Sequence, residues 1–123
     1  MSFSLGLALA NSGRFEQAEV LFTRVLAVAP ADFNILFNLG AVAASAGHYE
    51  RAREVFETAN RQQPQNIEVL FRLAGVQYEL KQPQAALPLL VRAAKLAPRR
   101  ADIQKMLALT TIALGATPSA GLW

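Results

Sequence analysis

Residues 33–64 of this chain read FNILFNLGAVAASAGHYERAREVFETANRQQP, and this stretch decides the fold. In its first half the apolar residues recur every three or four positions, which is the spacing that places them on one side of a helix. The members of this apolar row are Leu36, Leu39, Val42 and Ala43. The pattern predicts an amphipathic helix over residues 33–46, and the same reasoning predicts one over residues 67–80.

A tight turn and a second helix follow. Gly47 comes directly after the first helix, where a left-handed residue closes a helix and glycine adopts that conformation at little cost. Tyr49 then opens the second helix. This helix is expected to end before Pro64, because the residue that precedes a proline is disfavoured in the helical conformation. Residues 33–64 therefore predict a pair of helices.

The pair recurs along the chain. Pro30, Pro64 and Pro98 are each 34 residues apart, and the residues between them repeat in register. The recurring positions hold a leucine, a small residue beside it, a second small residue and a large apolar residue: Leu5, Leu39, Leu73 and Leu107; Gly6, Gly40, Ala74 and Ala108; Ala18, Ala52 and Ala86; Phe22, Phe56 and Leu90. Such a period indicates a repeat architecture in which stacked units bury a continuous apolar face.

Residues at the helix ends and contacts fit this scheme. Asp32 and Asn66 follow two residues after a proline and are expected to cap the next helix. Lys81 replaces the glycine in the third turn, and Pro83 suits the first turn of the helix that follows. The small residues should let the helices of a pair approach closely, with Phe56 and its equivalents filling the space between neighbouring pairs.

These features are similar to the tetratricopeptide repeat: the period, the pairs Leu5-Gly6 and Leu39-Gly40, the turns Gly13–Phe15 and Gly47–Tyr49, and the closing prolines. The resemblance covers residues 2–115. It departs from the family pattern at the bulky aromatic before the leucine and at the tyrosine after it, which here are Ser2, Leu36, Leu70 and Leu9, Ala43, Gln77. It implies an all-α, right-handed superhelical solenoid of antiparallel helix pairs.

Three pairs and one further helix are expected. The repeats should span about residues 1–30, 31–64 and 65–98, with a capping helix at 99–115, so that residues 1–115 form the repeat domain and 116–123 a C-terminal tail. The first pair begins only at Met1 and the last helix has no partner helix. Both ends therefore look cut, as in a piece of a longer array.

Composition excludes several classes of protein. No apolar run reaches the ~20 residues of a membrane-spanning helix, and no signal or transit peptide is visible, so the chain is expected to be soluble in a compartment that the sequence leaves open. The absence of cysteine removes disulfides, thiolate metal sites and cysteine nucleophiles. The formal charge of +3 comes from scattered basic residues, which argues against nucleic acid as a partner.

The sequence contains no recognisable catalytic set. His48 stands alone in a turn, without the second histidine or cysteine that a metal or nucleophile site needs, and is interpreted as a turn residue. Glycine-rich phosphate loops are missing. The chain is therefore predicted to be no enzyme and to need no cofactor or metal. One basic cluster, Arg92, Lys95, Arg99 and Arg100, is interpreted as stabilising a helix C-terminus, with an acidic partner as the alternative.

The resemblance implies that the first helices line a concave groove that binds an extended peptide or a protein. Helix geometry then assigns the groove-facing positions by their distance from each repeat leucine: Phe3, Asn34, Phe37, Asn38, Ala41, Phe71, Arg72, Gly75, Tyr78 and Lys105. Phe3, Phe37 and Phe71 would form a ladder of rings, or would pack between adjacent first helices instead. An exposed row of this kind favours binding.

One binding mode of the family can be compared residue by residue. Members that dock a peptide's C-terminal carboxylate use lysine, asparagine and arginine from three repeats; Asn38 and Arg72 match, whereas Phe3, Leu7 and Glu68 do not. Glu68 would repel a carboxylate, so an apolar or mixed peptide is favoured. The leading hypothesis is a protein interaction scaffold. Two alternatives stay open: self-association through the apolar last helix, and an accessory fragment of a larger multidomain protein.

Overall fold

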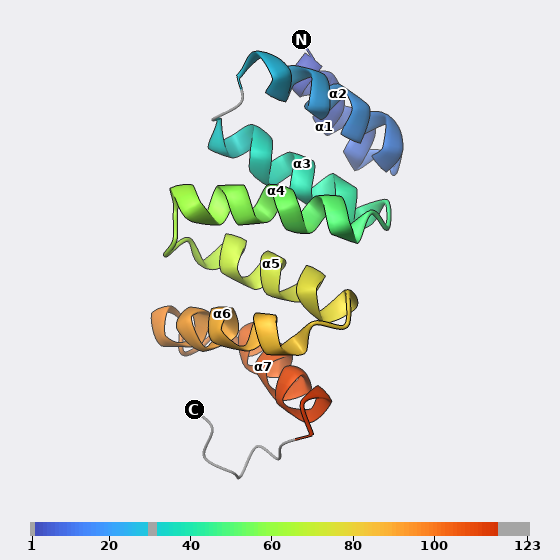
Figure 1. Cartoon of the computed structure of the whole chain (residues 1–123). Coiled ribbons are helices and arrows are strands. Elements are labelled where there is room, and N and C mark those ends of the chain that lie inside the picture. The colour runs from blue at the N-terminus through green and yellow to red at the C-terminus, as the bar shows by residue number, and fades with distance from the viewer. Residues whose placement is uncertain (1, 30–31, 116–123) are drawn as a thin grey trace. The chain divides into compact units, whose positions relative to one another are not determined.

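A computed structural model describes residues 2–29 and 32–115, with side chains from Leu5 onward. All regular secondary structure in these residues is helical (Figure 1). The seven helices in this part of the chain are α1 (Ser2–Asn11), α2 (Phe15–Val28), α3 (Phe33–Ser45), α4 (Tyr49–Gln62), α5 (Ile67–Glu79), α6 (Pro83–Leu96) and α7 (Ala101–Ala113). The prediction of three helix pairs followed by one more helix is confirmed.

The chain divides into two compact units, Met1–Gln62 and Gln63–Trp123, which are described separately. The first unit holds α1 to α4, in which α1 packs on α2, α2 on α3 and α3 on α4. The second unit holds α5 to α7, in which α6 packs on both α5 and α7. The tail predicted at residues 116–123 lies outside the described residues.

Short polar and left-handed residues set the helix ends. The side chain of Asp32 accepts a hydrogen bond from the backbone N–H of Ile35 at 3.1 Å, and Asn66 does the same for Val69 at 3.2 Å, so both predicted caps are confirmed. Each interhelical turn within a pair contains a residue with positive φ, and a fourth such residue follows α7: Gly13, Gly47, Lys81 and Gly115, at φ values between 63° and 85°. Lys81 thus adopts the left-handed conformation that glycine supplies in the other turns.

In the first unit a phenylalanine ring fills the space beside a glycine. A Cβ atom added to Gly40 would meet the ring of Phe56 at 2.6 Å, and one added to Gly6 would meet the ring of Phe22 at 2.9 Å. Both rings are fully buried. Phe56 therefore lies against Gly40 inside its own helix pair, which differs from the expectation that it fills the space between neighbouring pairs. The missing side chain lets the ring reach the backbone of the facing helix.

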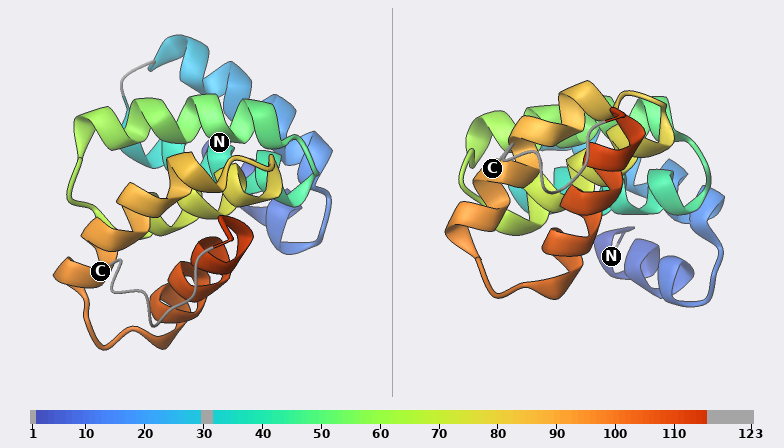
Figure 2. Two further views of the ribbon diagram at one scale, coloured as in Figure 1. Left: turned by 60° about the horizontal axis from the view of Figure 1, so that its bottom comes forward. Right: turned by 90° about the horizontal axis from the view of Figure 1, so that it is seen from below.

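The core of the second unit lies between α6 and the two helices that it packs on, α5 and α7. One cluster joins Ala74 of α5, Ala86 and Leu90 of α6 and Leu107 of α7. Another joins Leu70, Ala93 and Ile103. Figure 2 shows the loop after α6 turning the chain back so that α7 lies alongside it. The repeat leucines Leu73 and Leu107 are thereby buried, as the 34-residue register predicts.

Candidate functional site

In the first unit, four predicted groove residues lie on α3. Asn34 is exposed, and its backbone carbonyl accepts a hydrogen bond from Nδ2 of Asn38 at 2.7 Å. Phe37 is half-buried: its ring stacks on Phe33 with centroids 6.2 Å apart and meets Phe56 edge-on at 5.9 Å. Ala41 is also half-buried. Phe37 therefore contributes to the core of its own helix pair as well as to the surface.

In the second unit the predicted residues lie on α5 and α7. Phe71, Gly75 and Tyr78 share one face of α5 and are each half-buried, whereas Arg72 on α5 and Lys105 on α7 are exposed. A Cβ atom added to Gly75 would meet no atom within 4 Å. Gly75 therefore borders open space, unlike Gly40. The side chain of Phe3 lies outside the described residues, so the predicted ladder of three rings stays a prediction.

Arg100 ties α5 to the start of α7. Its guanidinium hydrogen-bonds the carboxylates of Glu68 and Asp102, and its Cζ lies 5.7 Å from the centre of the Phe71 ring. The hydrogen bond from Arg100 lowers the pKa of Asp102, and the bonds to both carboxylates raise the pKa of Arg100. Because the pKa of Asp102 is lowered in the folded chain, its pairing with Arg100 stabilises the fold at neutral pH. This stabilisation is lost as the pH falls through the range where Asp102 takes up a proton. Because Arg100 pairs with Glu68, the negative charge on this face of α5 is already offset.

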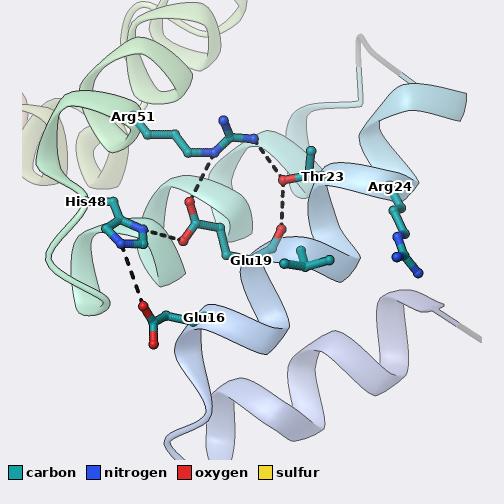
Figure 3. Close-up of a pocket in the computed structure, with 7 residues that line it drawn as sticks. Glu16, Glu19, Thr23, Arg24, His48 and Arg51 are labelled. Atoms are coloured by element: carbon teal, nitrogen blue, oxygen red, sulfur yellow. Dashed lines mark hydrogen bonds and ion pairs between the residues drawn. The ribbon is translucent and has the colours of Figure 1, made fainter.

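Another polar cluster lies in the first unit, between α2 and the start of α4 (Figure 3). Glu19 of α2 is only 8% exposed, and each of its carboxylate oxygens has a partner. His48 Nδ1 donates to Oε1 at 2.7 Å, and Arg51 Nε pairs with Oε2 at 3.1 Å. Arg51 also donates to Thr23 Oγ1 at 2.8 Å. Burying a charge is costly unless it is paired, and these partners come from the next helix pair, so the cluster holds the two pairs in register.

This cluster borders a pocket of about 560 Å³, whose other lining residues are Glu16, Val20 and Arg24. His48 Nε2 lies 3.9 Å from the carboxylate of Glu16. Sequence reasoning interpreted His48 as a turn residue and missed its pairing with Glu19. Glu19 stands where the later repeats have Arg53 and Leu87, so this position does not repeat and the register gave no signal for the pairing.

Two classes of site are absent from the described residues. Within residues 2–29 and 32–115, histidine and carboxylate side chains form no group of three or more that could hold a metal ion. None of the helices described above combines the length and the apolar composition that crossing a bilayer requires.

The fold is shared with solved repeat structures. MamA MSR-1 C2 superimposes with a TM-score of 0.89 at 22% identity, over 98% of this chain and 69% of that one. YrrB, described as a TPR protein with an unusual peptide-binding site, gives 0.82 at 23% identity over 93% of this chain and 59% of its own. The Sgt2 TPR domain from Aspergillus fumigatus gives 0.82 at 22% identity over 93% of this chain and 77% of that domain. At these identities the likeness shows the fold.

Sequence comparison identifies the family. The comparison with curated proteins found no significant match. Two family models described as tetratricopeptide repeat match residues 3–67 and 43–110, and each spans more than half of the chain. The chain belongs to the tetratricopeptide repeat family.

Proposed function

We propose that this chain is a scaffold that binds an extended peptide segment of a partner protein along the exposed faces of its first helices. Membership of the tetratricopeptide repeat family supports a protein interaction scaffold in general, and the family is typically non-catalytic. The candidate faces lie on α3 in the first unit and on α5 in the second. Each face presents partly exposed aromatic and polar side chains to a ligand.

The observation that carries the proposal is the open space above Gly75. This glycine lies inside α5, where it is less favourable than alanine by about 0.5–1 kcal/mol and relieves no steric clash. Phe71 and Tyr78 are one turn before and one turn after it on the same face. A ligand backbone can approach α5 closely at Gly75 and pack against the two aromatic side chains. Aromatic residues are enriched at protein interfaces for such contacts.

On α3 the ligand would meet polar groups as well as apolar ones. Asn34 is exposed, and Asn38 uses its Nδ2 group for a bond within the helix, which leaves its side-chain oxygen able to accept a hydrogen bond from a ligand. Extended peptides have unpaired backbone N–H groups that suit such an acceptor. Each face, taken by itself, suits a peptide of mixed composition better than a purely charged one. Micromolar affinity is expected, because a short peptide loses much of its contact energy to ordering.

Filling the space above Gly75 is the direct test. A ligand is first selected from a library of displayed peptides, and its affinity is measured by isothermal titration calorimetry. Gly75→Leu should weaken binding by about tenfold or more, because the leucine side chain occupies the space that the ligand backbone needs, and each 1.4 kcal/mol corresponds to a factor of ten. Helicity should be retained, since leucine is a better helix former than glycine.

The matched control is Ala27→Leu, which enlarges an exposed position on α2, a second helix. This variant should bind the selected peptide as the parent does. Equal affinity of the parent and Gly75→Leu would contradict the proposed site on α5. An equal loss of binding in both variants would show that the effect is not specific to position 75, which would also contradict the proposed site.

A second candidate function is self-association through α7. Leu109 is 37% exposed and Ile112 is 58% exposed on α7, and neighbouring exposed apolar side chains favour association. Leu109→Lys should therefore shift any oligomer toward monomer with helicity unchanged, because lysine also favours helices. Light scattering over a range of concentrations measures this. A variant and parent of equal mass at every concentration would contradict a role for α7 in assembly.

A further inference from the structure

The outer side of α6 carries a shallow apolar pocket with basic edges. We call it the α6 strip and define it by its lining residues Leu87, Pro88, Val91, Arg92 and Lys95, which enclose about 400 Å³. Leu87 and Val91 are half-buried and rest on the core, whereas the other three side chains are exposed. Leu87, Val91 and Lys95 are each four positions apart, as are Pro88 and Arg92, so the residues form two neighbouring rows on one face of the helix.

The same register in the first unit shows what such a face packs against. The equivalents of Leu87, Pro88, Val91 and Arg92, counted back by two repeats, are Glu19, Val20, Thr23 and Arg24, and these four residues line the pocket on α2. There the wall also includes His48 and Arg51, which come from the next helix pair. Among residues 5–29 and 32–115, those that line the α6 strip all belong to α6 itself. On α2 this face is bordered by residues of the next helix pair. On α6 the described residues that line the equivalent face include none from another helix.

The chemistry of the face changes between the repeats. On α2 the central positions are Glu19 and Thr23, which bond to the arginine and histidine of the next pair. On α6 these positions are Leu87 and Val91, which cannot form such bonds and are suited to apolar side chains. A helix that packs on α6 must therefore present apolar residues where the next pair presents His48 of its preceding turn and Arg51 of α4 to α2.

The basic residues around α6 indicate which charges a helix packed on it should carry at its edges. Residues 80–101 contain five basic residues and no acidic one. In the part of the chain that the structure covers, Lys95 and Arg99 form no ion pair, and Arg92 donates to the carbonyl oxygen of Pro64. The second unit as a whole carries seven basic and three acidic residues, against five and six in the first. The net charge of the protein is thus concentrated around α6.

We propose that the α6 strip docks an amphipathic helix of a partner protein, with its apolar side on Leu87 and Val91 and with acidic residues opposite Arg92 and Lys95. The register favours a helix over an anionic membrane surface, because the equivalent face on α2 already borders Arg51 of the helix α4. This interaction is separate from the peptide site on α3 and α5. It adds a second and chemically distinct partner surface to the scaffold.

The test uses a synthetic helix as the probe. A fluorescent peptide longer than the ~12–15 residues at which isolated helices become marginal carries leucines on one face and glutamates along both edges. Its counterpart has lysines in place of the glutamates. Fluorescence anisotropy with the full chain should show binding of the glutamate peptide and at least about tenfold weaker binding of the lysine peptide, with affinity falling as salt is added.

Variants then locate the interaction. Lys95→Glu should weaken binding of the glutamate peptide about tenfold, whereas Arg24→Glu, the same change of charge on α2, should leave it unchanged. Pro88→Glu combined with Val91→Thr should also abolish binding. These two side chains are tolerated by the architecture, because the chain itself has Glu54 and Thr23 at the same register. Circular dichroism of each variant separates a loss of binding from a loss of the helix. If Lys95 only stabilised the C-terminal end of α6, Lys95→Glu would lower the helix signal as well as the binding.

Several outcomes would overturn the proposal. Equal affinity for the two peptides, or an equal loss in Arg24→Glu and Lys95→Glu, would reduce the interaction to nonspecific electrostatics. Sedimentation of the chain with phosphatidylserine vesicles, without peptide binding and sensitive to Lys95→Glu, would assign the strip to a membrane. A dimer that dissociates in the Pro88→Glu, Val91→Thr variant would assign it to a second copy. None of these results depends on Gly75, so the peptide site on α5 is tested independently.

Discussion

Phe56→Ala is expected to destabilise the protein by about 3–5 kcal/mol, the range for removal of a fully buried aromatic ring. The ring is 1% exposed and fills the space above the backbone of α3 at Gly40. Alanine cannot fill that space, and Gly40 has no side chain that could move into it. The loss also removes the edge-on contact with Phe37. Urea denaturation of the full chain, followed by far-ultraviolet circular dichroism, measures the change.

A graded control comes from Phe56→Leu, which keeps most of the buried apolar volume and should cost distinctly less than the alanine variant. Phe37→Ala should cost less than Phe56→Ala as well, because Phe37 is half-buried. The order of the three losses is as informative as their size. A Phe56→Ala variant within about 1 kcal/mol of the parent would mean that the ring is not the main filling of this helix pair.

The fold was predictable because its determinants are local and periodic. Helix ends followed from single residues, such as Asp32 at a cap and Gly47 in a left-handed turn, and both were identified before any packing was known. The 34-residue register predicted the burial of Leu39, Leu73 and Leu107, which is confirmed, and of Leu5, for which it was wrong because Leu5 is 53% exposed. The direction in which Phe56 packs was not predicted correctly. Spacing along one helix does not show which of two neighbouring helices a large ring will contact.

The polar clusters were not predictable for a related reason. Glu19 and His48 are 29 residues apart, and Glu68 and Arg100 are 32 apart, so neither pair has a signature within one helix. Their pairing depends on which faces of successive helix pairs meet. Sequence reasoning assigned Arg100 to a basic cluster at the end of α6, whereas its guanidinium binds Glu68 and Asp102. The groove residues came from helix geometry and the family resemblance, and they remain a prediction whose test is Gly75→Leu.

Gly40→Ala and Gly75→Ala should change stability in opposite directions. Alanine is favoured over glycine inside a helix by about 0.5–1 kcal/mol, and both glycines lie inside helices, so propensity alone predicts that both variants are stabilised. At Gly40 the new Cβ would lie 2.6 Å from a ring atom of the buried Phe56. Relief requires the ring or the helix to shift, and overpacking of this kind costs about 1–3 kcal/mol. Gly40→Ala should therefore be destabilised by up to about 2.5 kcal/mol after the gain in propensity is subtracted.

At Gly75 nothing opposes the gain, because the added Cβ meets no atom within 4 Å. Gly75→Ala should be stabilised by about 0.5–1 kcal/mol, which urea denaturation resolves when parent and variant are measured side by side. The combination Gly40→Ala with Phe56→Leu gives the decisive comparison, since a smaller residue at position 56 should relieve the clash and make the double variant less costly than the sum of the single ones. Additive losses would show that the strain at Gly40 has another source than the Phe56 ring.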